Sequence, residues 1–166
     1  IVMKEGIITI GSNAFYGCGV EQMVIPKSVT DIKKKAFSNA KNLKEIKLSD
    51  EMKSIKEKTF EKCINLKFIT FGKKIAVIGE EAFENCKSLS MINIPGSVKR
   101  IEYEAFKNTG CEKVIIAEGV KSIDYWAFAK CKKLKEINIS SSVTTLQANA
   151  LANCPRLSQV LSLIHI

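Results

Sequence analysis

Residues Ile78–Val98 read IGEEAFENCKSLSMINIPGSV, and this stretch contains one complete repeating unit of the chain. The position of its phenylalanine recurs at intervals of 22 or 23 residues, at Phe15, Phe37, Phe60, Phe83, Phe106, Phe128 and finally Leu151. A period in the twenties is typical of a stacked solenoid. The sequence therefore predicts about seven coils, each contacting only its neighbours, that together present one long surface.

Each unit contains two hydrophobic periods. Ala36, Phe37, Ala40 and Leu43 fall on one face of a short helix, whereas the stretch 92–94 alternates apolar and polar residues as a strand does. Neighbouring strands pair at about 4.8 Å, but neighbouring helices need roughly 8 to 10 Å. The predicted fold is therefore an α/β solenoid of 22–23-residue coils, bent so that a parallel sheet lines the concave face and short helices line the convex face.

The full pattern I-x-x-x-A-F-x-x-C-x-x-L-x-x-I-x-I-P-x-S-V, carried by 78–98, resembles the BspA-like branch of the leucine-rich repeat superfamily. The resemblance covers residues 1 to about 160. It implies a right-handed leucine-rich solenoid found in large bacterial surface proteins associated with adhesion to host or neighbouring cells. It also implies a cell-surface or secreted location and a protein ligand on a host or neighbouring cell.

Both ends of the chain interrupt the repeat. Ile1 aligns with Val114 in mid-repeat, so we expect a single solenoid over 1–160 that is a fragment cut at both ends. The last six residues, 161–166 (LSLIHI), resemble the translated end of a sequencing adapter, which would make them an artefact. The alternative is a degenerate last strand. Under either interpretation, the only histidine, His165, carries no functional weight.

Composition narrows the classes of partner. With 46% hydrophobic and 26% charged residues over 166 positions, the chain is expected to fold. The net charge of +9 comes from 24 lysines and only two arginines, spread over turns and edges, so no specific nucleic-acid partner is predicted. Polyanion capture by these lysines remains an alternative. No apolar run approaches the roughly 18 residues of a membrane span, so we predict no membrane insertion and a monomeric fragment.

The cysteines follow the repeat. Five of the six lie three residues after the phenylalanine position, and Cys111 lies where the chain enters a strand. No C-x-x-C motif or Cys/His cluster is present, so we predict buried thiols and no metal site. Disulfides are not expected, because equivalent helix positions would lie beyond the roughly 7 Å Cα limit. With no histidine outside the tail, phosphate loop or nucleophile elbow, we predict no enzyme, catalytic residue or cofactor.

The candidate functional site is the outward side of the predicted concave sheet. Phe68, Met91 and Ile115 lie in adjacent coils and would form an apolar patch facing water, which is typical of a partner site. The polar candidates around them are Thr70, Asn93, Lys113, Lys47 and Glu45. Two hypotheses compete: a protein-recognition or adhesion segment, and a structural spacer with no ligand of its own. Replacing Phe68 and Met91 with serine would abolish binding only under the first hypothesis.

Overall fold

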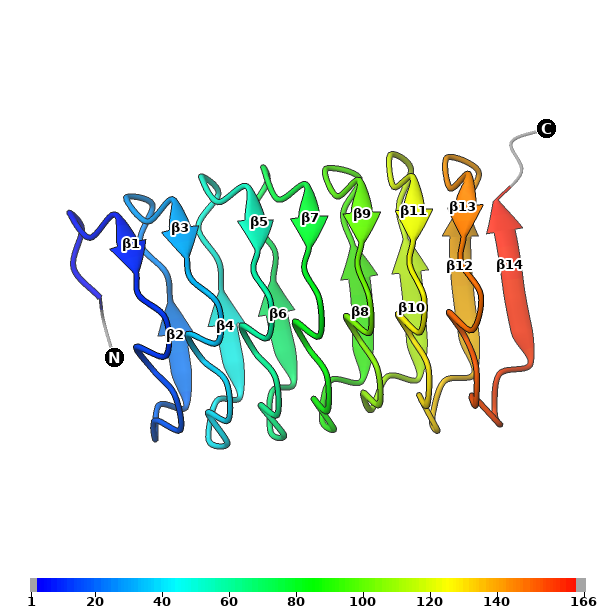
Figure 1. The fold of residues 1–166 in the computed structure, drawn as a ribbon, viewed down its shortest axis with the longest axis horizontal. Helices are drawn as coiled ribbons and strands as arrows, with labels where there is room; N and C mark the ends of the chain where they lie inside the picture. The colour runs from blue at the N-terminus through cyan, green and yellow to red at the C-terminus, as the bar shows by residue number, and fades with distance from the viewer. Residues whose placement is uncertain (1–2, 164–166) are drawn as a thin grey trace.

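The chain winds into a row of coils, and each coil contributes a longer and a shorter strand that pair with the equivalent strands of neighbouring coils (Figure 1). The computed structural model describes residues 3–163, which form fourteen strands and no helix. The longer strands of the coils lie side by side and form what we call the broad face. They are β2 (Gln22–Val24), β4 (Glu45–Lys47), β6 (Phe68–Thr70), β8 (Met91–Ile94), β10 (Lys113–Ile116), β12 (Glu136–Ser140) and β14 (Gln159–Leu163).

A second row of two-residue strands forms the narrow face. These strands are β1 (Thr9–Ile10), β3 (Asp31–Ile32), β5 (Ser54–Ile55), β7 (Val77–Ile78), β9 (Arg100–Ile101), β11 (Ser122–Ile123) and β13 (Thr145–Leu146). Every pairing in the described residues is parallel and joins equivalent repeat positions, as in Met23 with Ile46 and Ile92 with Val114. Identical positions therefore stack in columns along the array.

The third side of each coil is a run of tight turns, where the sequence predicted a short helix. Ser38 N–H donates to Lys35 C=O at 3.0 Å and Ala40 N–H to Phe37 C=O at 3.0 Å, so these bonds span three residues rather than four. Lys35 and Asn39 have φ of 58° and 59°, a left-handed conformation that ends any right-handed helical run. The predicted helices are therefore wrong.

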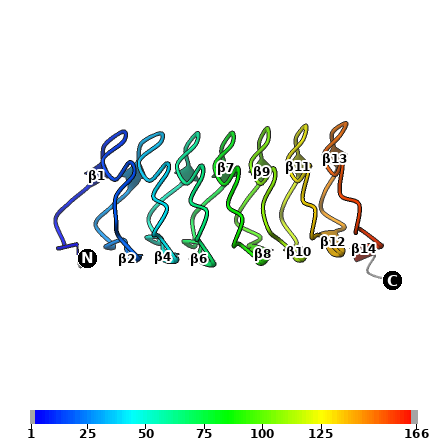
Figure 2. The same cartoon turned by 90° about the horizontal axis from the view of Figure 1, so that it is seen from below.

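These turns are tied to the next coil by main-chain hydrogen bonds. Phe37 N–H donates to Thr59 C=O at 2.9 Å and Asn39 N–H to Glu61 C=O at 2.7 Å. The turn side thus repeats at a spacing close to that of strands, and neighbouring core phenylalanine rings lie 4.9 to 5.4 Å apart. Because the strand side and the turn side of the coils repeat at similar distances, stacking the coils does not bend the array. Figure 2 shows the coils in an almost straight row, so the broad face replaces the predicted concave face.

One continuous core runs through the coils. The predicted phenylalanine column is confirmed: Phe37, Phe60, Phe83, Phe106 and Phe128 are fully buried. Their rings stack face to face, with interplanar angles between 2° and 18°. Isoleucine side chains from the strands and leucine side chains from the turns that precede the broad strands complete the core around this column.

The ends of the chain concern the predicted origin of residues 161–166 and the prediction of no membrane insertion. Leu161 and Ser162 belong to β14 and pair with Asn138 and Ile139 of β12. Residues 1–2 and 164–166, which include Ile1 and His165, lie outside the described residues, so the origin of the last six residues stays a prediction. Between 3 and 163, the structure contains no helix that is long and apolar enough to cross a membrane.

Candidate functional site

The predicted site residues all project outward from the broad face. Glu45 and Lys47 lie on β4, Phe68 and Thr70 on β6, Met91 and Asn93 on β8, and Lys113 and Ile115 on β10. Each lies next to an inward-pointing residue along its strand, as period-two alternation requires. Most are exposed, while Lys113 and Ile115 are half-buried.

The apolar patch spans three neighbouring strands of the broad face. Phe68 is 63% exposed and Met91 53% exposed, on consecutive strands of the broad face. Ile115 pairs with Asn93, whereas Met91 pairs with Lys113. Ile115 is therefore the diagonal neighbour of Met91 on the outward side of the next strand. The structure thus brings Phe68 and Met91 to the two sides of one strand boundary and leaves Ile115 one strand away.

That strand boundary is a break in the sheet. The broad face divides into β2-β4-β6 and β8-β10-β12-β14, with no pairing between β6 and β8. At an intact boundary, Lys67 N–H donates to Lys44 C=O at 2.8 Å. The equivalent bond, from Ser90 N–H to Lys67 C=O, is missing among the described residues. Figure 1 shows the arrows of β6 and β8 standing further apart than their neighbours.

A large side chain lies behind this break. The interior position after the broad strand holds Leu48 in one coil and Ile94 in another, but Phe71 in the coil between them. The Phe71 ring packs edge-on against Phe83 with centroids 6.2 Å apart. Because interiors are close-packed, the extra volume displaces the neighbouring coil. Ile69 is consequently half-buried, although Ile46 and Ile92, its counterparts in the preceding and following coils, are fully buried.

The narrow face is interrupted in the same coil, between β3 and β5. Met52 is fully buried two residues before the start of β5, at a position that Val29 and Val98 hold in other coils. The Phe60 ring, which lies between Met52 and Phe71 in the sequence, remains stacked 5.4 Å from Phe37. One coil with two oversized interior residues therefore separates both sheets while the phenylalanine column stays continuous.

The break on the broad face opens a groove of about 490 Å³, which we call the β6/β8 groove. It is lined by Glu45, Lys67, Phe68, Ile69, Thr70, Ser90, Met91 and Asn93. Lys67, Ile69 and Ser90 were not among the predicted site residues. The sequence signal that could have found them is Phe71, because it is the one aromatic residue at its interior repeat position.

The comparison with known families settles the class of the repeat. A pattern described as the BspA type leucine rich repeat region, in six copies, matches residues 1–111 and 53–163. The chain belongs to the BspA-type leucine-rich repeat family. This membership confirms the resemblance drawn from the repeat, and nothing in the family points to enzymatic activity.

Solved structures agree with this assignment. The chain is similar to the leucine-rich repeat protein of T. pallidum, with a TM-score of 0.86 and 29% identity over 95% of this chain and 77% of that one. It is also similar in fold to the pneumococcal vaccine antigen PcpA, with a TM-score of 0.65 and 18% identity over 79% of this chain and 32% of that one. A leucine-rich cell surface protein of Faecalibacterium prausnitzii matches with a TM-score of 0.50 and 19% identity, over 99% of this chain and 59% of that one. Among proteins of curated function, no relative matches the chain.

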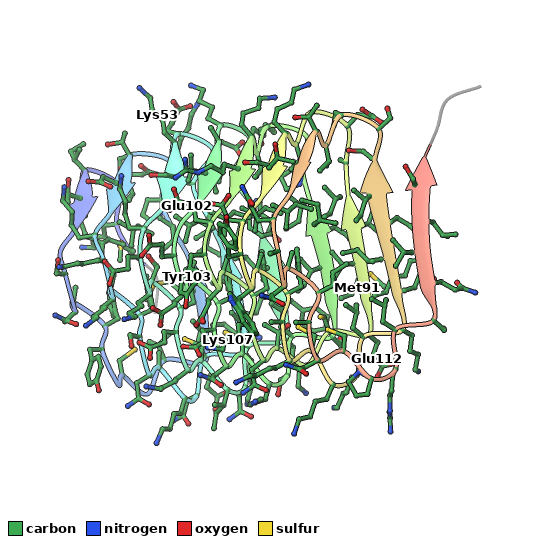
Figure 3. All side chains as sticks on the ribbon, turned by 45° about the vertical axis from the view of Figure 1, so that its right-hand side comes forward. Lys53, Met91, Glu102, Tyr103, Lys107 and Glu112 are labelled. Atoms are coloured by element: carbon green, nitrogen blue, oxygen red, sulfur yellow. The ribbon has the colours of Figure 1, made fainter. Side chains whose placement is uncertain are left out.

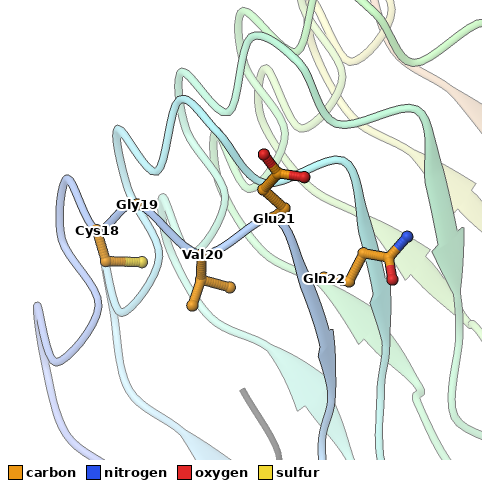
Figure 4. A pocket seen from close by; sticks show the side chains of 5 residues that line it. All are labelled: Cys18, Gly19, Val20, Glu21 and Gln22. Atoms are coloured by element: carbon orange, nitrogen blue, oxygen red, sulfur yellow. The ribbon is translucent and has the colours of Figure 1, made fainter.

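A second cavity of the BspA-type array, of about 610 Å³, lies on the first coil (Figure 4). It is lined by Cys18, Gly19, Val20, Glu21 and Gln22. Its one charged group, the Glu21 carboxylate, already forms an ion pair with Lys44 at 2.8 Å. This cavity therefore offers little chemistry for recognising a ligand.

The turn side carries three carboxylates close enough to share a cation. Oxygen atoms of Glu81, Glu84 and Glu104 lie within 4.8 Å of one another. Lys107 Nζ forms ion pairs with Glu104 at 2.5 Å and with Glu84 at 3.5 Å, and Lys58 Nζ forms one with Glu81 at 3.3 Å. Burial raises the pKa of Glu84. The lysines already compensate these charges, so the cluster is an ion-pair network between coils. Figure 3 labels Lys107 of this network.

Sequence reasoning also missed a group of aromatic residues on this turn side. Tyr103 and Tyr125 occupy the same repeat position in adjacent coils and are both largely exposed. Trp126 follows at a φ of 61°, an unusual conformation for a bulky residue. The sequence signal would have been the position three residues before the core phenylalanine, where other coils carry Glu57 and Glu80.

The cysteine column packs in the core as predicted, but for a different reason. Cys63, Cys86 and Cys131 are fully buried, and all six cysteines are free thiols. The Cys63 thiol donates to Phe37 C=O at 3.1 Å, and the Cys86 thiol to Phe60 C=O at 3.2 Å. The helix-diameter argument for their separation is wrong, because no helices separate the coils. The thiols instead satisfy carbonyl groups of the preceding coil.

Burial of these thiols predicts a stability loss at alkaline pH. Burial raises the pKa of Cys63 from its ordinary value of 9.0 to about 12. Above pH 9.0 the unfolded chain loses this proton while the folded chain keeps it, so stability falls with rising pH until about 12. A Cys63→Ala variant should show a shallower decline in the urea midpoint over this range. Equal slopes for the two proteins would contradict the argument.

Proposed function

We propose that this BspA-type array is a non-catalytic protein-recognition segment of a bacterial cell-surface or secreted protein. Its contact surface is the broad face, centred on Phe68 and Met91, with Ile115, Thr70 and Asn93 beside them. The observation that carries the proposal is the exposure of two large apolar side chains on either side of a groove in an otherwise regular sheet.

Physical chemistry favours this face over the others. Exposed clusters of large apolar side chains mark partner sites more often than chance, and aromatic residues and methionine are enriched at the centres of interfaces. Glu45, Lys47 and Lys113 would form the polar rim. The names of two similar structures, a vaccine antigen and a cell surface protein, support a location at the cell surface.

The test uses the double variant Phe68→Ser, Met91→Ser, coated on beads and presented to cultured epithelial cells and to bacterial cells. We expect wild-type beads to adhere, the double variant to lose most adhesion, and trypsin treatment of the target cells to abolish adhesion, because the partner is a protein. The unfolding midpoint should change little, since both side chains are exposed.

The matched control is Val24→Ser, because Val24 is 61% exposed on the same face but lies on β2, two strands from β6. This variant should adhere like the wild type. Equal adhesion of wild type and double variant would contradict the recognition role and favour the spacer. Adhesion that survives trypsin but falls steeply with salt would favour polyanion capture.

A further inference from the structure

We propose that one edge of the array binds a linear, sulfate-bearing polysaccharide. The inference goes beyond the proposed function and does not rest on it, because it concerns other residues than Phe68 and Met91. The edge is formed by the turns that lead into β8, β10, β12 and β14, which lie side by side below these strands in Figure 1. The basic edge consists of the cationic side chains of these turns, Lys87, Lys132, Lys133, Lys135 and Arg156.

The first argument is the concentration of charge. The four turns, at 86–90, 110–112, 131–135 and 154–158, contain these five cations and a single carboxylate, that of Glu112. All five cationic side chains are exposed. The turns thus hold nearly half of the chain's net charge of +9. A surface that concentrates one sign of charge raises the local concentration of ligands of the opposite sign.

The second argument is the lack of partners for these cations. Elsewhere in the array, lysines pair with a carboxylate of the neighbouring coil, as Lys44 does with Glu21 at 2.8 Å. On the basic edge Lys135 follows this rule, with Glu112 at 2.8 Å. Within residues 3–163, no ion pair joins the other four cations of the edge. Their charges are therefore available to an external anion.

Two of these lysines repel each other across an intervening coil. Burial, followed by repulsion from Lys132, lowers the pKa of Lys87. The coil between them carries Gly110, whose N–H donates to Cys86 C=O at 3.2 Å. A Cβ atom on Gly110 would collide with the main-chain oxygen of Lys87, so this position cannot carry a side chain. An anionic group bound beside both lysines would relieve their repulsion.

The remaining cations gather around one carboxylate. Lys135, followed by Lys133 and Arg156, lowers the pKa of Glu112. Glu112 lies at this edge in Figure 3, where the broad strands begin. One carboxylate shared by three cations leaves a local excess of positive charge, which favours an anionic ligand.

The third argument is the linear, rigid arrangement of the edge. Lys135 N–H donates to Glu112 C=O at 2.9 Å, and Ser158 N–H donates to Lys135 C=O at 3.1 Å. Coils joined in this way repeat at about 4.8 Å, so the four turns extend over roughly 14 Å. Because the main chain is already ordered, a ligand does not have to supply the free energy of ordering it. A row of fixed cations suits a linear polyanion.

The uncharged residues of the turns favour a polysaccharide over other polyanions. The hydroxyls of Ser88 and Ser90 can donate to and accept from the hydroxyls of a sugar. The turns contain no aromatic residue on which a nucleic-acid base could stack. Sulfate groups supply dense negative charge, and each offers several oxygen atoms to ammonium groups.

The test measures how a fluorescein-labelled heparin oligosaccharide binds the full chain, by fluorescence anisotropy in about 0.15 M salt. The triple variant Lys132→Gln, Lys133→Gln, Arg156→Gln should lose at least tenfold in affinity. Its binding should also depend less on salt, because fewer ion pairs form with the polyanion. Chemically desulfated heparin and single-stranded DNA should bind the wild type at least tenfold more weakly than heparin does.

The matched control removes the same charge from three exposed lysines outside the basic edge, as Lys34→Gln, Lys53→Gln, Lys56→Gln. Figure 3 shows Lys53 at the opposite edge of the array from Glu112. This control should lose less than twofold in affinity. Equal losses in the two triple variants would reduce the effect to diffuse attraction and overturn the proposal. It would also be overturned by DNA binding as tightly as heparin, or by no heparin binding at all.

A measurement on the wild-type chain does not depend on any variant folding. Lysines are acetylated with and without bound heparin, and the modified positions are quantified by mass spectrometry. Bound heparin should slow acetylation of Lys87 and Lys132 severalfold and leave Lys53 unchanged. Protection that is absent, or equal at all three lysines, would contradict a site on the basic edge.

The outcomes also separate this proposal from the recognition role of the broad face. If heparin binds the basic edge but Phe68→Ser, Met91→Ser adheres to cells like the wild type, the polysaccharide site stands and the proposed function fails. If the double variant loses adhesion while the edge variant binds heparin like the wild type, the proposed function stands and the polysaccharide site fails.

Discussion

Replacing Phe83 with alanine is expected to lower the free energy of unfolding by about 3 to 5 kcal/mol, as truncation of buried phenylalanine does. Phe83 stacks against Phe60 at 5.2 Å and Phe106 at 5.0 Å, and its edge contacts Phe71 at 6.2 Å. The cavity would therefore open between three coils at once. Because each coil is stabilised by its neighbours, the whole array should melt at a lower urea concentration, measured by circular dichroism.

The control for this variant is Phe68→Ala, which removes an equal number of atoms from an exposed ring. It should change the free energy of unfolding by no more than about 0.5 kcal/mol. A wild-type midpoint for Phe83→Ala would show that the phenylalanine column does not hold the coils together.

Replacing Gly119 with alanine should cost at least about 2 kcal/mol, because strain and overpacking each contribute about 1 to 3. Gly119 has a φ of 114°, a conformation that side chains disfavour. A Cβ atom there would lie 2.2 Å from the main-chain oxygen of Gly96 in the preceding coil. Lys99 Nζ donates to the oxygens of both glycines, at 3.0 and 3.3 Å, so the turn cannot shift without losing these bonds.

Gly11→Ala is the matched control, since no atom lies within 4 Å of its added Cβ and its φ is not positive. It should leave the urea midpoint unchanged or raise it slightly. Should Gly119→Ala be as stable as Gly11→Ala, the close approach between these two coils would not be required for folding.

The repeat alone predicted the architecture because its information is redundant. The phenylalanine period placed the core column, and the alternation at 92–94 placed a strand that the structure confirms as part of β8. Seven copies of a pattern average out the ambiguity that any single short segment carries. The outward positions of Phe68 and Met91 followed directly from this alternation.

The turn side could not be predicted by hydrophobic spacing. Ala36, Phe37, Ala40 and Leu43 point into the core whether the chain forms a helix or a series of tight turns, because both place these side chains on one side. The distinguishing signal was Asn39, with counterparts at Asn85, Asn108 and Asn153, since asparagine tolerates the left-handed conformation. From this single error followed the predicted bend and the predicted separation of the cysteines.

The β6/β8 groove could not be predicted because it results from the volume of one side chain and not from a change in polarity. Phe71 is apolar, like Leu48 and Ile94 at the same repeat position, so the hydrophobic pattern of the sequence is unchanged there. The effect of the Phe71 side chain depends on how much space lies between two coils, and the spacing of hydrophobic residues in the sequence carries no information about that space. The hydrogen bond from Ser90 N–H to Lys67 C=O is absent because the large Phe71 side chain holds the two coils apart at this point.

The coil that contains Met52 and Phe71 also affects how the array responds to force. Neither sheet is continuous across the array: the narrow face parts before this coil and the broad face parts after it, while the aromatic column passes through. A pull along the long axis is therefore shared by two hydrogen-bonded ribbons everywhere except here. Beside each break the other ribbon is still paired, β4 with β6 on the broad face and β5 with β7 on the narrow face. A single ribbon therefore bears the tension there, together with the stacked rings and the turn bonds, and the rod is more compliant at this coil than elsewhere.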